Sequence, residues 1–180
     1  MGVIRIPLHE DCVKTGELCS ICRSKINSGV IGEWEVNVMK ALLELSEKLN
    51  LNHRYESSAI AGSTLYIALE GPPLEGLENE LSKRIQVRGV GRVRVIYYSG
   101  GLDKLLEAIF GQRILSINRV YSSDGSLTIV VKVRKRDPGA AKLASLLLKT
   151  NVEVEVEAEK VRVDQVKIGK PDIRKILEKF

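Results

Sequence analysis

The chain has 180 residues, 44% of them hydrophobic, which is enough to bury one core or two small ones without covalent staples. No apolar run approaches the roughly 20 residues that span a bilayer, and the first residues lack the layout of a secretory signal. We therefore expect a cytoplasmic protein with no membrane partner. Residues 1–80 carry 7 basic and 12 acidic side chains, and residues 81–180 carry 21 and 11, so the second half favours a polyanionic partner.

The first segment, "IPLHEDCVKTGELCSICRSKI", contains every cysteine of the chain and one of its two histidines. An odd number of cysteines in one short stretch argues against a disulfide framework. His9 and Cys12 form one pair with two residues between them, and Cys19 and Cys22 form another, with Gly16 in the connection. Tetrahedral zinc requires two such pairs. Because four protein ligands leave no open position, we expect a structural Zn2+ in a zinc-binding lobe over residues 1–31.

Two other interpretations of this segment stay open. The cysteines could pack as small hydrophobic side chains, with His9 beside them by chance. Alternatively "CSIC" could be a thioredoxin-like redox pair, which would leave His9 and Cys12 without a role. The nearby Lys14, Arg23 and Lys25 could contact a phosphate or simply be solvated.

The next stretch shows regular periodicity. "WEVNVMKALLELSEKL" predicts an amphipathic helix over residues 35–49, and "RYESSAIAGSTLYIALEG" predicts two strands with Gly62 between them. "PPLEGLENELSKR" predicts a helix that begins at its prolines, and "GRVRVIYY" predicts a half-buried strand.

The same order of elements then returns. "LDKLLEAIF" predicts a helix, "RILSINRVYSSDGSLTIVVKV" a hairpin that turns at Asp124 and Gly125, "PGAAKLASLLLK" a helix and "NVEVEVE" a strand. "KALLEL" matches "KLLEAI", and "STLYIAL" matches "SLTIVVK", at offsets of 64 and 63 residues. The sequence thus predicts a duplication with units at 32–98 and 99–165. "EKVRVDQVKIGK" could add a strand, and "PDIRKILEKF" predicts a helical tail within 166–180.

A cysteine-rich segment followed by two units of helix, two strands, helix and strand resembles the archaeal NusA-like proteins. These are RNA-binding factors of transcription elongation and termination with tandem type II KH domains. The resemblance implies an α+β fold, single-stranded RNA as partner, and contact with RNA polymerase or another nucleoprotein assembly. KH domains grip RNA with a GxxG loop. "EGPPLEG" places Gly71 and Gly76 too far apart for that pattern, and "DPGAAK" has Gly139 but Lys142 at the fourth position.

Clusters of basic residues extend the case for RNA. The candidate RNA-binding residues are Lys83, Arg84, Arg88, Arg92 and Arg94 in the first unit, and Arg134, Lys135, Arg136 and Lys142 in the second. Such clusters neutralise phosphates without reading bases, although alternating Arg and Lys also solvate the outer face of a sheet. Tyr97, Tyr98 and Tyr121 are candidates for base stacking or for ordinary packing.

No catalytic pattern is recognisable. His53 has no nucleophile pattern near it, "RGVGR" lacks the third glycine of a dinucleotide site, and "VEVEVEAE" reads as a strand with one wet face. We therefore expect a non-enzymatic protein without a small-molecule substrate. Two functions remain open. One is an RNA-binding factor, and the other is a protein-interaction scaffold that docks onto RNA polymerase or a ribonucleoprotein without gripping RNA.

Overall fold

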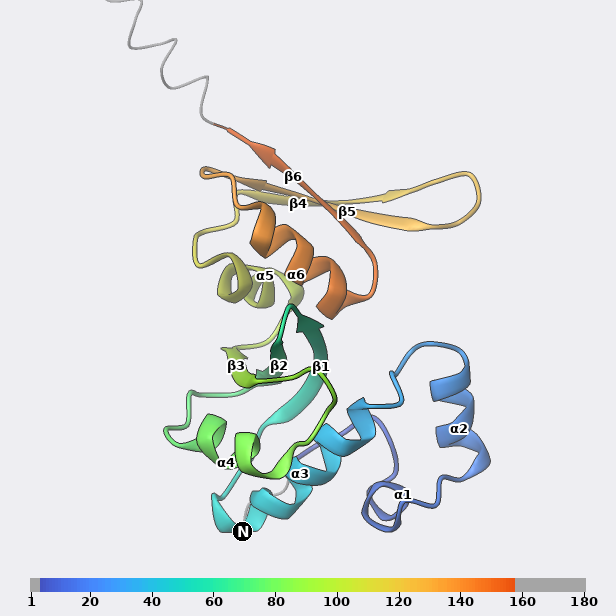
Figure 1. Ribbon diagram of the computed structural model, residues 1–180. Coiled ribbons are helices and arrows are strands. Elements are labelled where there is room, and N and C mark those ends of the chain that lie inside the picture. Colours follow the sequence, from blue (N-terminus) through green and yellow to red (C-terminus); the bar gives the residue numbers. More distant parts are fainter. Residues whose placement is uncertain (1–3, 158–180) are drawn as a thin grey trace, which may run out of the picture.

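The computed structural model describes residues 4–157, which form an α+β structure of six helices and two three-stranded sheets (Figure 1). The helices are α1 (Glu10–Thr15), α2 (Ser20–Asn27), α3 (Glu35–Lys48), α4 (Leu77–Arg84), α5 (Leu102–Phe110) and α6 (Pro138–Leu148). The strands are β1 (Arg54–Ala61), β2 (Thr64–Glu70), β3 (Arg92–Tyr98), β4 (Ser116–Tyr121), β5 (Leu127–Val133) and β6 (Asn151–Val156). The strand and the helical tail predicted after residue 158 lie outside the described residues.

Two consecutive units share one topology. In each, a helix precedes an antiparallel strand pair, and after a second helix the third strand pairs in parallel with the middle one, giving the orders β1-β2-β3 and β4-β5-β6. The order of elements predicted from residue 35 to residue 156 is confirmed. The predicted unit boundaries at residues 32, 98 and 165 stay predictions.

The start of α4 was predicted wrongly. The helix begins at Leu77, after Gly76 in a left-handed conformation (φ 89°), and the two prolines lie in the preceding loop. Pro72 cannot start the helix because its carbonyl oxygen accepts a hydrogen bond from His53 Nε2 at 2.7 Å. The Tyr97 hydroxyl likewise donates to the carbonyl oxygen of Leu74 at 3.1 Å, so this loop is tied to the sheet.

The first segment shares a core with the first unit. Ile4, Val13 and Cys22 belong to the same buried cluster as Leu42 of α3 and Leu65 of β2. The backbone of Arg5 also bonds to the start of β1, since its N–H donates to His53 O (3.0 Å) and its carbonyl accepts from Tyr55 N (2.8 Å). Apolar burial therefore joins residues 4–31 to α3 and the first sheet.

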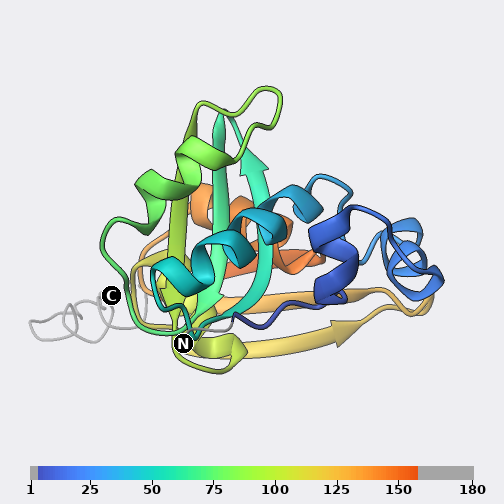
Figure 2. The ribbon, with the colours of Figure 1, turned by 90° about the horizontal axis from the view of Figure 1, so that it is seen from below.

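The helices of the second unit cover the outer face of the first sheet. Ala59, Ala68 and Tyr98 of this face form a buried cluster with Leu105 of α5 and Leu147 of α6. Seen from below, α3 lies in front of the first sheet and α6 behind it (Figure 2). The first sheet is thus packed on both faces.

A buried carboxylate joins the two units. Glu35 of α3 is 1% exposed, and Lys149, which follows α6 with φ 56°, places its ammonium 2.5 Å from Glu35 Oε2. The other donors to this carboxylate are the N–H of Gly32 (2.7 Å), the hydroxyl of Tyr55 (2.5 Å) and the N–H and hydroxyl of Ser58 (both 3.2 Å). Burial, and then the neighbouring Glu35, raise the pKa of Tyr55. Both oxygens of this buried carboxylate therefore have hydrogen-bond partners, which offset the cost of removing it from water.

Candidate metal centre and basic surface

The four predicted metal ligands lie together. One ligand atom from each of His9, Cys12, Cys19 and Cys22 lies within 4.8 Å of all the others. His9 Nδ1 is 3.2 Å from Cys19 Sγ and 3.9 Å from Cys12 Sγ. Ligands bonded at 2.0–2.3 Å around a tetrahedral ion are about 3.3–3.8 Å apart. Both His9 distances are close to this spacing, and the 4.8 Å limit of the cluster is about 1 Å wider, so a small inward shift would complete the site. Cys12 and Cys22 are buried, whereas His9 is exposed.

Two helix starts place the ligands. His9 is the N-cap of α1 and Cys12 lies three residues later, and Cys19 and Cys22 repeat this arrangement on α2. Free N–H groups at a helix start favour negative charge. A hydrogen bond from the Cys22 backbone is the largest effect that holds the pKa of the Cys19 thiol at about 6, below its ordinary 9.0. Gly16 (φ 81°) ends α1 and turns the chain back, as predicted.

This geometry bears on the other interpretations of the segment. "CSIC" follows a helix and a turn, whereas a thioredoxin-like pair would follow a strand. Chance packing of cysteines would not require His9 Nδ1 to point at the sulfur atoms, yet it does. Three thiols and one imidazole could therefore hold a metal ion, and this donor set suits zinc.

The predicted RNA-binding residues fall into two groups. Lys83 pairs with Glu80 (3.6 Å) and Arg84 with Glu44 (3.5 Å), so their charges are partly neutralised. The remaining seven, which are exposed and form no ion pair with any residue in 4–157, are Arg88, Arg92, Arg94, Arg134, Lys135, Arg136 and Lys142. Their charge is available to a polyanion.

The loop before α6 is held in a fixed shape. The side chain of Gln112 donates to the carbonyl oxygen of Lys135 (2.9 Å) and accepts from its N–H (3.1 Å). Asp137 then caps α6, because its Oδ1 accepts from the N–H of Ala140 at 3.0 Å. Arg134 and Arg136, on either side of Lys135, are exposed like it, so this loop presents three cations. Gly139 lies inside the first turn of α6 rather than in the loop.

The corresponding loop of the first unit differs. Its glycine, Gly71, packs against the buried His53, and a Cβ there would lie 2.4 Å from the imidazole ring. His53 Nδ1 is buried without a hydrogen-bond partner among the described residues, and Nε2 donates to the carbonyl oxygen of Pro72. The loop carries Glu75 and no basic residue. Its negative charge and lack of cations make it a poor phosphate site.

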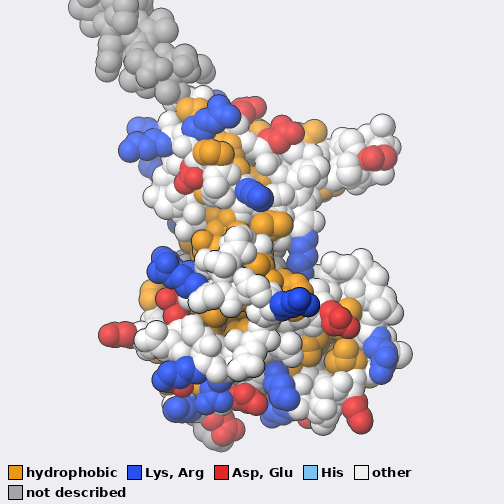
Figure 3. Space-filling view, in the orientation of Figure 1, with side chains coloured by type: hydrophobic (Ala, Val, Ile, Leu, Met, Phe, Trp, Pro, Cys, Tyr) orange, Lys and Arg blue, Asp and Glu red, His pale blue; other side chains and the backbone are white. Residues whose placement is uncertain are grey.

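A groove separates the two units beside their apolar contact. It has a volume of about 670 Å³ and is lined by β2 and β3 of the first sheet and by α5 and α6. Figure 3 shows apolar side chains exposed where the units meet, with basic side chains around them. Arg94 and Lys142 lie at this groove, far apart in sequence but together in the fold.

Tyr66 and Asp137, which also line the groove, were not singled out from the sequence. Their place depends on packing between units, although the pairing of Tyr66 with Arg94 follows from the strand register. Of the predicted stacking residues, Tyr98 is buried between the units and Tyr97 is half-buried. Tyr121 is 67% exposed on the β4–β5 hairpin.

No protein-family model and no curated protein matches this chain. Among solved structures, one titled "Crystal structure of APE1850" is similar at 18% identity with a TM-score of 0.42, covering 65% of this chain and 96% of that one. The site is therefore interpreted from its own geometry. In the described part of the chain, no helix has the length and apolar character needed to cross a membrane.

Proposed function

We propose that this protein is a non-enzymatic RNA-binding factor similar to the archaeal NusA-like proteins, acting in transcription elongation or termination. The observation that carries the proposal is a set of five exposed basic side chains that form no ion pair within residues 4–157: Arg94 and Lys142 at the groove, and Arg134, Lys135 and Arg136 on the second loop. Cations on a loop held by Gln112 can contact phosphates at little further entropic cost.

The repeated topology supports two type II KH-like units. Each has a helix, an antiparallel strand pair, a second helix and a parallel third strand. Neither loop contains GxxG, so Arg134, Lys135 and Arg136 contact the sugar-phosphate chain in place of a close glycine backbone.

The metal is a structural zinc ion in this proposal. Three thiolates and one imidazole fill its four positions and leave none for water or substrate. The test is elemental analysis of protein purified without chelators. We expect about one equivalent of zinc, and less than about half an equivalent would refute the site.

The RNA proposal is tested by the salt dependence of single-stranded RNA binding. The variant Arg134→Gln/Lys135→Gln/Arg136→Gln is compared with wild type. If all three cations contact phosphates, the slope of log K against log salt should become shallower by about 2, from about 0.7 per contact. The control Lys40→Gln removes an exposed charge on α3 that forms no ion pair within residues 4–157 and should leave the slope unchanged. Absence of binding at low salt would refute the proposal.

A scaffold role is the second candidate, and the β4–β5 hairpin favours it. This hairpin projects from the second sheet (Figure 1), and its Val120 and Tyr121 are 51% and 67% exposed. Exposed apolar residues on a projecting hairpin suit a protein contact. This function predicts that RNA polymerase binds the protein without RNA and that Val120→Ser/Tyr121→Ser abolishes the binding.

A further inference from the structure

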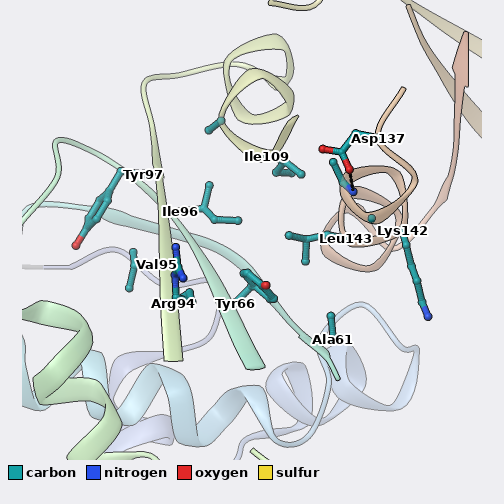
Figure 4. Close-up of a pocket in the computed structure, with 13 residues that line it drawn as sticks. Ala61, Tyr66, Arg94, Val95, Ile96, Tyr97, Ile109, Asp137, Lys142 and Leu143 are labelled. Atoms are coloured by element: carbon teal, nitrogen blue, oxygen red, sulfur yellow. Dashed lines mark hydrogen bonds between the residues drawn. The ribbon is translucent and has the colours of Figure 1, made fainter. Parts of the chain in front are cut away.

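The groove between the units has the features of a binding pocket rather than of a plain interface. Its centre is apolar, formed by Ile96 of β3, Ile109 of α5 and Leu143 of α6, and Tyr66 of β2 lies on one side (Figure 4). Asp137 lies at one end of the pocket (Figure 4). A volume of about 670 Å³ is in the usual range of ligand pockets.

The polar groups around the pocket limit what can enter it. Arg94 and Lys142 are exposed at the rim and unpaired within residues 4–157, and Figure 4 shows Lys142 extending outward. One carboxylate oxygen of Asp137 accepts from the N–H of Ala140 at 3.0 Å, and the other has no donor among residues 4–157. A phosphate would be repelled by this carboxylate, whereas a neutral donor group would bind to it.

The lining of the pocket sets three conditions for a ligand. It must be flat and apolar for the centre, carry a hydrogen-bond donor for Asp137, and have negative charge outside for Arg94 and Lys142. A base of a single-stranded nucleic acid meets each condition, and an unpaired base can leave its stack to enter a pocket. A duplex cannot present a base in this way.

We infer that this pocket receives one RNA base that carries an exocyclic amino group. The ring lies against Tyr66 and Leu143, the amino group donates to the free oxygen of Asp137, and the flanking phosphates contact Arg94 and Lys142. Cytosine is therefore accepted over uracil, which has the same size but a carbonyl oxygen in place of the amino group. This inference rests on the proposed RNA-binding function and adds base preference to it.

The substitution Asp137→Asn tests the preference without removing the helix cap. Asparagine caps helices as well as aspartate does, so its carbonyl oxygen keeps the bond to Ala140 N–H. Its amide NH₂ group then faces the pocket, and an acceptor has become a donor. The preferred base should change from cytosine to uracil.

The experiment measures binding of short oligocytidylate and oligouridylate at low salt by fluorescence anisotropy. We expect the wild type to favour oligocytidylate by about ten-fold and Asp137→Asn to remove or reverse that ratio. Tyr66→Ala should weaken both oligonucleotides by about ten-fold, and Tyr121→Ala, on the distant hairpin, should weaken neither. Circular dichroism and urea midpoints must show that each variant is folded.

The outcomes separate the two proposals. Equal affinities for both oligonucleotides that Asp137→Asn does not alter, with weaker binding in the variant lacking Arg134, Lys135 and Arg136, would overturn the pocket and leave RNA binding intact. No binding of either oligonucleotide at low salt would overturn the RNA function together with the pocket.

Discussion

The substitution Lys149→Met tests whether the buried Glu35 carboxylate holds the two units together. Methionine keeps most of the length of the lysine side chain. Neither residue favours the φ of 56° found at this position, so the backbone strain stays the same and the substitution tests the loss of the ammonium group. Removing one partner of a fully buried pair costs about 3–5 kcal/mol. Lys149 is 32% exposed and Glu35 keeps its neutral donors, so we expect a smaller loss, about 2 kcal/mol.

A matched control is available in the same unit. Lys132 pairs with Glu157 at 3.5 Å and is 31% exposed, nearly the same as Lys149, but its partner is 33% exposed rather than 1%. Lys132→Met should therefore cost no more than about 1 kcal/mol, as for other surface pairs. The two substitutions remove the same group, but Lys149 lies closer to its carboxylate, also donates to the carbonyl oxygen of Val30 (2.7 Å), and leaves a carboxylate that is more deeply buried.

The measurement is urea unfolding followed by circular dichroism and by the fluorescence of Trp34, the only tryptophan, which lies next to Glu35 in the sequence. A double-mutant cycle with Glu35→Gln should give a coupling energy of about 1–2 kcal/mol. If Lys149→Met costs no more than Lys132→Met and the coupling is below about 0.5 kcal/mol, the carboxylate does not hold the units together.

Three further predictions concern the metal, the first loop and α6. Cys22→Ala should lower the thermal midpoint of the first unit because the segment shares its core, and a chelator that destabilises the wild type should then have no further effect. Gly71→Ala should lower the free energy of unfolding in urea by about 3 kcal/mol, because its Cβ would meet the His53 ring. Gly76→Ala has open space around its Cβ and only the strain of φ 89°, so it should cost about 1 kcal/mol. Equal costs would contradict this reasoning. Gly139→Ala should stabilise α6 by up to about 1 kcal/mol, because its Cβ meets nothing closer than 3.6 Å. An unchanged affinity for RNA in this variant would show that the RNA does not approach the backbone of Gly139.

The elements could be predicted from local pattern because apolar periodicity and turn residues set them. The helix at Leu102–Phe110 has the predicted bounds, and the strand at Arg92–Tyr98 begins one residue after the predicted Gly91. The start of α4 was missed because a long-range contact, from His53 to the carbonyl of Pro72, outweighs the preference of proline for a first helical turn. Predictions from neighbouring residues do not include contacts between residues that are far apart in the sequence.

The metal ligands could be predicted because all four lie within one short segment. The groove could not, since Tyr66 and Asp137 meet only when the second unit packs on the first sheet. Glu35 was also missed, because a glutamate in the first turn of a helix normally faces water. Its partner Lys149 lies 114 residues further along the chain.

The shared core of the first segment and the first unit sets an order of assembly during synthesis. The four candidate ligands leave the ribosome before α3 and the first sheet, whose side chains complete their surroundings. The second unit, with the loop of Arg134, Lys135 and Arg136 and about half of the residues that line the groove, is made after the first, and Lys149 reaches Glu35 only after α6 is complete. The groove proposed to bind RNA therefore forms only on a first sheet that is already in place, so a chain that fails to form the first unit presents an incomplete groove.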